Sequence, residues 1–363
     1  MSTAAAVPIV AMEVPIATGD RMQWIELTIP SSCTLPPSDS VAVNTPAIRR
    51  NTASCHVISG DPPAYLLWRI HGNLPNVLEV VVLFACYEYP DTGLRFYFPE
   101  ELYPFAFLCK NELNKDAGGD AYLLYALTVS GTAYLLNLKR PFKYVPGSIF
   151  SSNELIEFSV QSSAPDAKIT TVAATLGCLV IGRQDGSISC YQLGVLHPNK
   201  PGFMSELRDD AGLGRLWNLM SRGKAIGAVL DMTILEVWNK KLLFVLHSDG
   251  NMRIWDLLNW TRVLSHNLSS ATTPSRFWVG SADYESKAIT IAVLYVTDVE
   301  VITFYNIGFN VGEKRTLLLE PLSRSVTFDK GSFIDLKINS NKLWIIKEDG
   351  SFFYELSEHD YMR

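Results

Sequence analysis

The most regular pattern along this chain is an apolar run that breaks at a short polar turn and then resumes. In its clearest copy, Leu242 to Leu257, the apolar run stops at Ser248 to Gly250 and continues as an alternating run that ends in Trp255-Asp256. Apolar and alternating runs that flank a turn rich in Asp and Gly form a β-hairpin. The pattern therefore predicts a hairpin over this stretch.

The same unit recurs along the chain. Copies run from Leu123 to Leu138, Cys178 to Leu193 and Leu343 to Leu356, and weaker ones from Tyr65 to Phe84 and Ile291 to Ile307. The turn glycines fall at 72, 131, 186, 250 and 350, so successive gaps are 59, 55, 64 and 100 residues, and the last gap fits two units. Because compact propeller blades repeat about every 40 to 45 residues, the longer gaps indicate insertions between strands.

A further strand precedes several of these hairpins, at Ile169 to Thr175, Ala228 to Val237 and Phe333 to Asn339. Three or four neighbouring strands make a blade, and a blade is stable only when both of its faces pack against other blades. We therefore predict an all-β fold, a β-propeller over residues 61–363 with about six to seven blades and a ring that need not be complete.

The first 60 residues differ from this pattern. Met22 to Ile29 predicts one strand, whereas Ser31 to Pro46 is rich in Ser, Pro and Thr and lacks periodicity. We expect a strand followed by a mobile loop over residues 1–60. Our hypothesis is that this strand closes the ring by completing a blade begun near the other end of the chain.

One segment, residues 203–223, departs from the β pattern. Its apolar residues recur at helical spacing and predict a short α-helical insertion between two blades. The favoured interpretation is that this apolar stripe packs on the side of the propeller, and an exposed docking helix is the alternative. The candidate partner surface consists of Leu207, Leu213, Leu216, Trp217 and Met220.

Residues that recur from unit to unit are expected to be structural, because a catalytic residue should occur once. The predicted turn residues are Gly131, Asp185, Gly186, Asp249, Gly250, Asp349 and Gly350. Large aromatic residues occupy equivalent strand positions and should pack between blades. These predicted packing residues are Trp255, Tyr191 and Tyr354.

Composition narrows the possible functions. The 363 residues are 48% hydrophobic and carry a net charge of −6, which argues against direct nucleic-acid binding. The most apolar window, Val77 to Cys86, is too short to span a bilayer and contains Glu79, and the first basic residue is Arg21. We expect an intracellular protein without membrane insertion.

Cys178 and Cys190 lie in predicted strands and should be buried, reduced thiols.

The search for chemistry finds no catalytic motif. The sequence has no phosphate-binding loop, no His-Glu-x-x-His and no Gly-x-Ser-x-Gly, and its six histidines are scattered. Adjacent carboxylates such as Asp209-Asp210 point to opposite sides of a strand, the wrong arrangement for paired acid and base catalysis. We predict no enzyme activity, catalytic residue, cofactor, metal site or small-molecule substrate.

Four stretches together resemble a known family: Gly182 to Leu193, Glu206 to Asp210, Gly212 to Gly223 and Phe244 to Leu257. They are similar to the hundred-and-sixty-kilodalton class of scaffold nucleoporins, and most similar to its plant members. The combination of an Arg-Leu-Trp insertion with a following Trp-Asp hairpin is specific. The resemblance covers about residues 55–356.

This resemblance implies a seven-bladed propeller followed by a helical stack, in a coat component without enzyme activity. It also implies assembly with other subunits of the Y-shaped nuclear pore subcomplex at the nuclear envelope, and a role in mRNA export and nucleocytoplasmic transport. The chain ends at Arg363, before any counterpart of the helical stack. Two other classes stay open, a soluble propeller adaptor (a ubiquitin-ligase substrate receptor or a coat subunit) and a propeller enzyme acting at the central channel.

Overall fold

The computed structural model describes most of the repeat region. The described residues are 22–30, 52–58, 64–71, 73–84, 92–110, 121–139, 144–151, 154–160, 168–192, 203–207, 227–269, 272–283, 288–310, 316–329, 333–339, 342–347 and 350–355. Within them the regular structure consists of β-strands in six sheets, and no helix occurs.

The first three sheets follow one another in the chain. The first has the spatial order β1-β5-β4-β3-β2 and contains β1 (Gln23–Thr28), β2 (Thr52–Ile58), β3 (Ala64–His71), β4 (Leu74–Phe84) and β5 (Thr92–Tyr97). The second contains β6 (Leu102–Lys110), β7 (Ala121–Thr128), β8 (Thr132–Lys139) and β9 (Leu155–Ser159). The third contains β10 (Ile169–Thr175), β11 (Cys178–Arg183), β12 (Ile188–Gln192) and β13 (Phe203–Leu207).

The last three sheets continue in the same way. The fourth contains β14 (Val229–Val237), β15 (Lys240–His247), β16 (Asn251–Asp256) and β17 (Thr261–Asn267). The fifth contains β18 (Pro274–Asp283), β19 (Ala288–Val296), β20 (Val299–Asn310) and β21 (Thr316–Asp329). The sixth contains β22 (Phe333–Asn339), β23 (Lys342–Lys347) and β24 (Gly350–Glu355).

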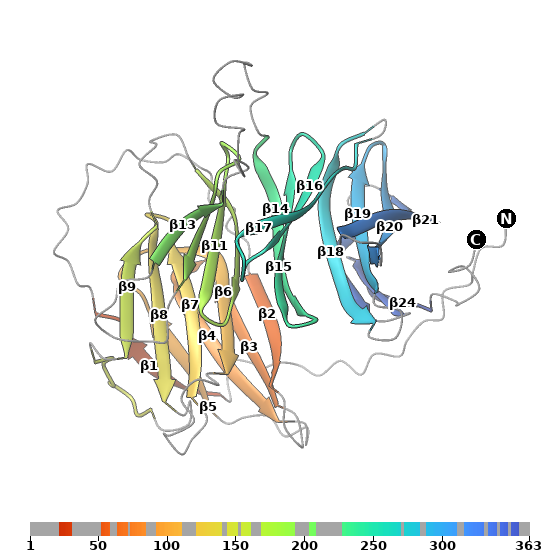
Figure 1. The fold of residues 1–363 in the computed structure, drawn as a ribbon. Helices are drawn as coiled ribbons and strands as arrows, with labels where there is room; N and C mark the ends of the chain where they lie inside the picture. Colours follow the sequence, from red (N-terminus) through yellow and green to blue (C-terminus); the bar gives the residue numbers. More distant parts are fainter. Residues whose placement is uncertain are drawn as a thin grey trace.

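The sheets are arranged as the blades of a β-propeller. In sheets two to six the strands pair antiparallel with their neighbours in the chain. Successive sheets lie beside one another, because β10, β14, β18 and β22 each contact the first strand of the preceding sheet. β6 contacts β2, the edge strand of the first sheet at the end opposite β1. Figure 1 shows the sheets following one another from orange to blue. The predicted all-β propeller is therefore confirmed.

The central strands show why continuous apolar runs fold as blades. In β15 the residues from Leu242 to His247 are all buried. Leu242, Phe244 and Leu246 belong to the hydrophobic cluster shared with the fifth sheet, whereas Leu243 and Val245 belong to the cluster shared with the third. Since successive side chains of a strand point to opposite faces, one unbroken apolar run supplies two interfaces.

Hydrophobic clusters fill the space between each sheet and the next. In the described part of the chain, five clusters join sheets one and two, two and three, three and four, four and five, and five and six. Outer strands are less buried than central ones, since every residue of β17 is exposed or only partly buried. The core is therefore a series of layers between blades, and each blade depends on its neighbours.

The predicted N-terminal strand forms, but its predicted role in ring closure is wrong. It is β1, and it pairs in parallel with β5 at the outer edge of the first sheet. Its apolar residues explain this position, because Leu27 and Ile29 are buried in the cluster between sheets one and two. The bridge between Thr28 and Ile149 also joins the end of β1 to the segment between β8 and β9.

Two predicted boundaries also differ from the structure. Thr52–Ile58 is β2, which pairs with β3, so the first sheet begins before residue 61. The helical insertion predicted over residues 203–223 is wrong for Phe203–Leu207, which form β13 and pair with β12. Residues 208–226 lie outside the described part of the chain. Backbone pairing to an open strand edge therefore determines the secondary structure of residues 203–207 more strongly than local periodicity does.

Candidate functional site

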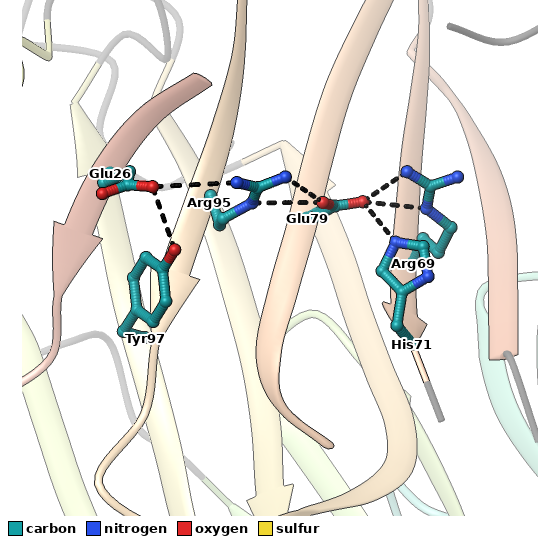
Figure 2. A network of polar contacts seen from close by, with 6 residues as sticks. All are labelled: Glu26, Arg69, His71, Glu79, Arg95 and Tyr97. Carbon is teal, nitrogen blue, oxygen red and sulfur yellow. Dashed lines mark hydrogen bonds and ion pairs between the residues drawn. The ribbon is translucent and has the colours of Figure 1, made fainter. Parts of the chain in front are cut away.

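A group of polar side chains crosses one face of the first sheet (Figure 2). We call it the first-sheet network, and it consists of Glu26 on β1, Arg69 and His71 on β3, Glu79 on β4, and Arg95 and Tyr97 on β5. It is the most connected cluster of charged side chains among the described residues, and it is therefore the first place to look for a function.

Strand register places the charges of the network side by side. Arg69 pairs with Glu79, Glu79 pairs with Arg95, and Arg95 pairs with Glu26. Opposite charges directly across neighbouring strands attract each other. The residues next to these charges along the strands, such as Leu78 and Phe96, belong to the cluster between the first and second sheets. The network therefore lies on the face of the first sheet that points away from the second sheet.

Glu79 is the centre of the network. Its side chain is only 3% exposed. One carboxylate oxygen, Oε2, accepts hydrogen bonds from Arg69 Nε at 2.8 Å and Arg69 Nη2 at 2.5 Å, and lies 2.9 Å from His71 Nε2. The other, Oε1, accepts from Arg95 Nε at 3.2 Å and Arg95 Nη2 at 2.8 Å. Both oxygens are therefore fully engaged with cationic partners.

These contacts decide the charge state of Glu79. Burial alone would raise the pKa of its carboxyl, because it disfavours the charged form. Hydrogen bonds from Arg95, Arg69 and His71 outweigh burial and hold the pKa of Glu79 below its ordinary value of 4.5. The pKa of Arg95 is raised, since its hydrogen bonds to Glu79 outweigh the opposing effect of burial. Glu79 is therefore an anion near neutral pH.

The network also attaches β1 to the sheet. Tyr97 donates a hydrogen bond of 3.0 Å to Glu26 Oε1, and Arg95 Nη1 lies 3.7 Å from the same oxygen. The guanidinium of Arg95 lies 4.7 Å from the ring centroid of Trp24, a favourable cation–π contact. A Cβ atom at Gly93 would lie 2.5 Å from the Trp24 ring, so this ring covers the glycine of the neighbouring strand.

The chemistry of the first-sheet network is that of a structural clamp. An ionised Glu79 has no proton to donate, and its lone pairs are taken up by two arginines and a histidine. A general acid or base needs a free, correctly protonated group within reach of a substrate. The network instead joins four strands of the first sheet through charge-assisted hydrogen bonds.

The predicted turn residues lie where strands reverse. Gly131, Gly186 and Gly250 have φ angles of 87°, 82° and 78°, which favour glycine. Each donates its N–H to the carbonyl three residues earlier, at 2.9 to 3.1 Å. Asp185 Oδ1 and Asp249 Oδ1 accept hydrogen bonds from backbone N–H groups two residues later. Gly350 begins β24, and Asp349 lies outside the described residues.

Two of the three predicted packing residues, Trp255 and Tyr191, lie in two different interfaces. Trp255 is 4% exposed and belongs to the cluster between sheets three and four. Tyr191 belongs to the cluster between sheets two and three, where its ring centroid lies 5.5 Å from that of Phe158. The backbone of Tyr354 pairs with Leu343 in the sixth sheet.

The candidate partner surface lies mostly outside the described residues. The backbone of Leu207 pairs with Ile188. The remaining members, Leu213, Leu216, Trp217 and Met220, fall within residues 208–226, which the structure does not describe. This surface stays a prediction from the sequence.

Hydrogen bonds between sheets add to the apolar layers. Val160, which follows β9, donates its N–H to Gly131 O in the same sheet, and its carbonyl accepts a hydrogen bond of 3.1 Å from Arg183 in the third sheet. Leu268, which follows β17, donates its N–H to Gly250 O in the turn of its own sheet. The carbonyl of Leu268 accepts a hydrogen bond of 2.9 Å from the Tyr295 hydroxyl in the fifth sheet. The same connection therefore occurs at two interfaces.

Sequence reasoning missed the first-sheet network. Glu79 was noticed only as a charge that interrupts an apolar window. A carboxylate inside an apolar strand needs cationic partners, because an unpaired buried charge is costly. Arg69 lies in the same predicted hairpin as Glu79, Tyr65 to Phe84, whereas no predicted strand contains Arg95. Only the strand register shows that both arginines meet Glu79.

Two searches of the described residues concern other classes of site. They contain no group of three or more His, Cys, Asp or Glu side chains arranged to hold a metal ion. Likewise, no helix in the part of the chain that the structure describes is long and apolar enough to cross a membrane.

Comparison with known proteins identifies the family. Residues 64–357 match the family model of the β-propeller domain of nucleoporin Nup120/160. The chain belongs to this family. It is also 37% identical over 367 residues to the nuclear pore complex protein NUP160 of Arabidopsis thaliana, in an alignment that covers 97% of this chain and 24% of the Arabidopsis protein. The chain thus spans about a quarter of the length of this relative, and the predicted resemblance to scaffold nucleoporins is confirmed.

Two solved structures are similar to the chain at low scores. The β-propeller domain of Cps50 (Swd1) from Myceliophthora thermophila is 9% identical, with a TM-score of 0.46 over 85% of this chain and 87% of that domain. BBS1N, crystallised in complex with ARL6DN, is 11% identical, with a TM-score of 0.39 over 85% of this chain and 66% of that one. At these scores neither structure adds to the assignment to the Nup120/160 family.

Proposed function

We propose that this chain is the β-propeller part of a nuclear pore scaffold subunit that acts by binding neighbouring proteins and catalyses no reaction. The observation that carries the proposal is the family match over residues 64–357, together with 37% identity to Arabidopsis NUP160 over 97% of this chain. The proposed location is the nuclear pore complex at the nuclear envelope. The proposed role is support of mRNA export and nucleocytoplasmic transport.

The construction of the propeller supports a scaffold role. Five apolar layers join the described sheets, and backbone carbonyls at Val160 and Leu268 accept hydrogen bonds from the next sheet. Close-packed protein interiors resist deformation. A subunit of a large assembly needs such rigidity, because each bound neighbour must be held at a fixed distance and angle.

The proposed partners are other subunits of the Y-shaped nuclear pore subcomplex. The candidate partner surface, Leu207, Leu213, Leu216, Trp217 and Met220, is the part of the sequence that we propose for this contact. Large aromatic and aliphatic side chains dominate the energy of protein interfaces. Replacing Trp217 with Ala should therefore weaken the recovery of partners. An unchanged thermal unfolding temperature would show that Trp217 is exposed for docking, and a lowered one that it packs on the propeller.

Quantitative affinity purification tests the proposed function and separates it from the adaptor alternative. The chain is tagged and purified from cells of its own organism under mild salt, with the tag alone as the control. Enrichment of Y-complex nucleoporins above all other proteins is the expected result. Enrichment of ubiquitin-ligase or vesicle-coat subunits in their place would show that the propeller serves as a soluble adaptor.

A further inference from the structure

Two buried thiols face each other inside the third sheet. Cys178 begins β11 and Cys190 lies on β12, and their sulfur atoms are 3.1 Å apart. Both cysteines are reduced, with exposed fractions of 6% and 0%. We call them the thiol pair. Their role in packing does not require two sulfur atoms at this distance, since any small apolar residue would fill the same space.

Strand register explains why the two sulfurs meet. Cys178 pairs with Gln192, and Val180 pairs with Cys190, so the two cysteines are diagonal neighbours on adjacent strands. Both belong to the cluster between sheets three and four, and they therefore lie on the same face of the third sheet. A disulfide needs a sulfur–sulfur distance of about 2.05 Å. The two sulfurs would have to approach by about 1 Å to make the bond.

The surroundings distinguish the two thiols. The hydrogen bond with Cys190 and the charge of Lys241 lower the pKa of Cys178, against the opposing effects of burial and of Glu236. The same hydrogen bond and burial raise the pKa of Cys190. Lys241 is held in place, because its Nζ donates to Leu176 O at 2.9 Å and lies 3.2 Å from Glu236 Oε1. Cys178 is therefore the thiol that ionises first, and the thiolate is the nucleophilic form.

We propose that the thiol pair is a redox modification site, in which hydrogen peroxide converts Cys178 and Cys190 to a reversible disulfide. The Cys178 thiolate attacks one peroxide oxygen, the O–O bond breaks, and hydroxide leaves, which oxidises Cys178 to a sulfenic acid and reduces the peroxide. The sulfur of Cys190 then attacks the sulfenic sulfur. The S–O bond breaks, and the departing hydroxide takes the thiol proton and leaves as water.

The bond would form where three sheets meet. Gly177, beside Cys178, donates its N–H to the Tyr125 hydroxyl of the second sheet at 3.0 Å, and Lys241 of the fourth sheet bonds to Leu176 O. Oxidation would therefore tie β11 to β12 beside two contacts between sheets. This inference does not depend on the proposed role at the nuclear pore.

Peptide mapping of the folded chain tests the proposal. Trypsin cuts after Lys168 and Arg183, so the two cysteines fall in separate peptides. After treatment with hydrogen peroxide and blocking of free thiols, we expect the two peptides to be linked, with a loss of about 2 Da that dithiothreitol reverses. Separate, fully blocked peptides after a dose of peroxide that oxidises free glutathione would overturn the proposal.

Two serine variants test the order of the steps. In Cys190→Ser, the sulfenic acid on Cys178 has no partner thiol and should accumulate as a dimedone adduct. In Cys178→Ser, the adduct at Cys190 should be absent, and an adduct there would contradict the assignment of the nucleophile. Lys241→Met should move the midpoint of the pH profile for oxidation to higher pH, a change that loss of packing alone would not produce. An unmoved midpoint would remove Lys241 from the proposal.

Discussion

At the scale of single residues, burial decides which side chains are structural. Trp255 is 4% exposed between two sheets, whereas Leu258, three residues later, is 54% exposed. Removing a buried aromatic ring loses its transfer free energy and leaves a cavity. Trp255 and Leu258 therefore form a matched pair for measuring what the layer between sheets three and four contributes.

We expect Trp255→Ala to lower the free energy of unfolding by about 3 to 5 kcal/mol. Leu258→Ala, the control, should change it by less than about 0.5 kcal/mol. Urea denaturation followed by circular dichroism measures both. Equal and small losses for the two variants would place Trp255 at the surface and favour a ligand-binding role for its ring.

Glu79 makes the opposite kind of contribution, through charge. Glu79→Gln keeps the shape of the side chain but leaves Arg69 and Arg95 without their anion, and we expect a loss of about 3 kcal/mol at neutral pH. The exposed Glu26, 58% accessible, is the control, and Glu26→Gln should cost less than about 1 kcal/mol. Urea denaturation of both variants at pH 7 makes the comparison. Similar losses would show that Glu79 is not the centre of the network.

Because the pKa of Glu79 is lowered, its contribution to the stability of the fold depends on pH. A carboxyl whose pKa is lower in the folded chain stabilises the fold above its ordinary pKa of 4.5, and this stabilisation disappears as the pH falls through the folded value. The difference in stability between wild type and Glu79→Gln should therefore shrink below about pH 4.5. Denaturation curves at several pH values measure it. A difference that grows in acid would contradict the assignment.

The residue scale also shows the limit of the sequence. Trp255 and the turn glycines could be chosen because they repeat, and repetition is visible in one dimension. The first-sheet network could not be predicted from the sequence, since Arg69, Glu79 and Arg95 become neighbours only through the pairing of β3, β4 and β5. The thiol pair depends in the same way on the register of β11 and β12.

At the scale of elements, the turns can be compared with one another. Gly250 and Gly147 have similar positive φ angles, 78° and 81°. A Cβ at Gly250 would lie 1.7 Å from Ser269 Oγ and 2.9 Å from Ser269 Cβ, whereas a Cβ at Gly147 meets nothing within 4 Å. A side chain at either glycine would therefore meet the same backbone strain, but only at Gly250 would it also collide with a neighbouring residue.

Gly147→Ala should therefore cost only the strain of the left-handed conformation, about 1 to 2 kcal/mol. Gly250→Ala should cost more, because Ser269 must also move. Adding Ser269→Gly to Gly250→Ala should remove this additional cost, so that the double variant loses about as much stability as Gly147→Ala. Thermal unfolding of the three variants measures these effects, and equal losses for the two single variants would show that the contact with Ser269 is unimportant.

The N-terminal strand gives a second test at this scale. β1 covers the outer edge of β5 and buries Leu27 beside the second sheet. Deleting residues 1–30 should therefore speed hydrogen exchange of the β5 amides and leave β16, three sheets away, unchanged. Hydrogen exchange with mass spectrometry reads both strands. Unchanged exchange in β5 would mean that β1 does not protect this edge.

Strands were easier to predict than their pairing. Ile169–Thr175 and Phe333–Asn339 were predicted with the boundaries that the structure shows, because polar turns bound their apolar patterns. The partner of β1 was predicted wrongly, since any exposed strand edge accepts a strand by backbone hydrogen bonds. β13 was predicted as part of a helix because it was grouped with residues 213–220, whose apolar side chains fit helical spacing.

At the scale of the whole molecule, the apolar layers between sheets join the blades into one body. The period of the repeat predicted this architecture, and the family match over residues 64–357 agrees with it. The proposed scaffold role rests on that family membership. It concerns the location and partners of the chain more than any reaction.

Localisation in living cells tests this central claim most directly. The chain carries a fluorescent tag and is expressed at native level in cells of its own organism, beside a marker of the nuclear envelope. We predict a punctate signal at the nuclear rim that coincides with nuclear pores. A signal spread through the cytoplasm, from a tagged chain shown to be folded, would contradict the proposal that this propeller is part of the pore scaffold.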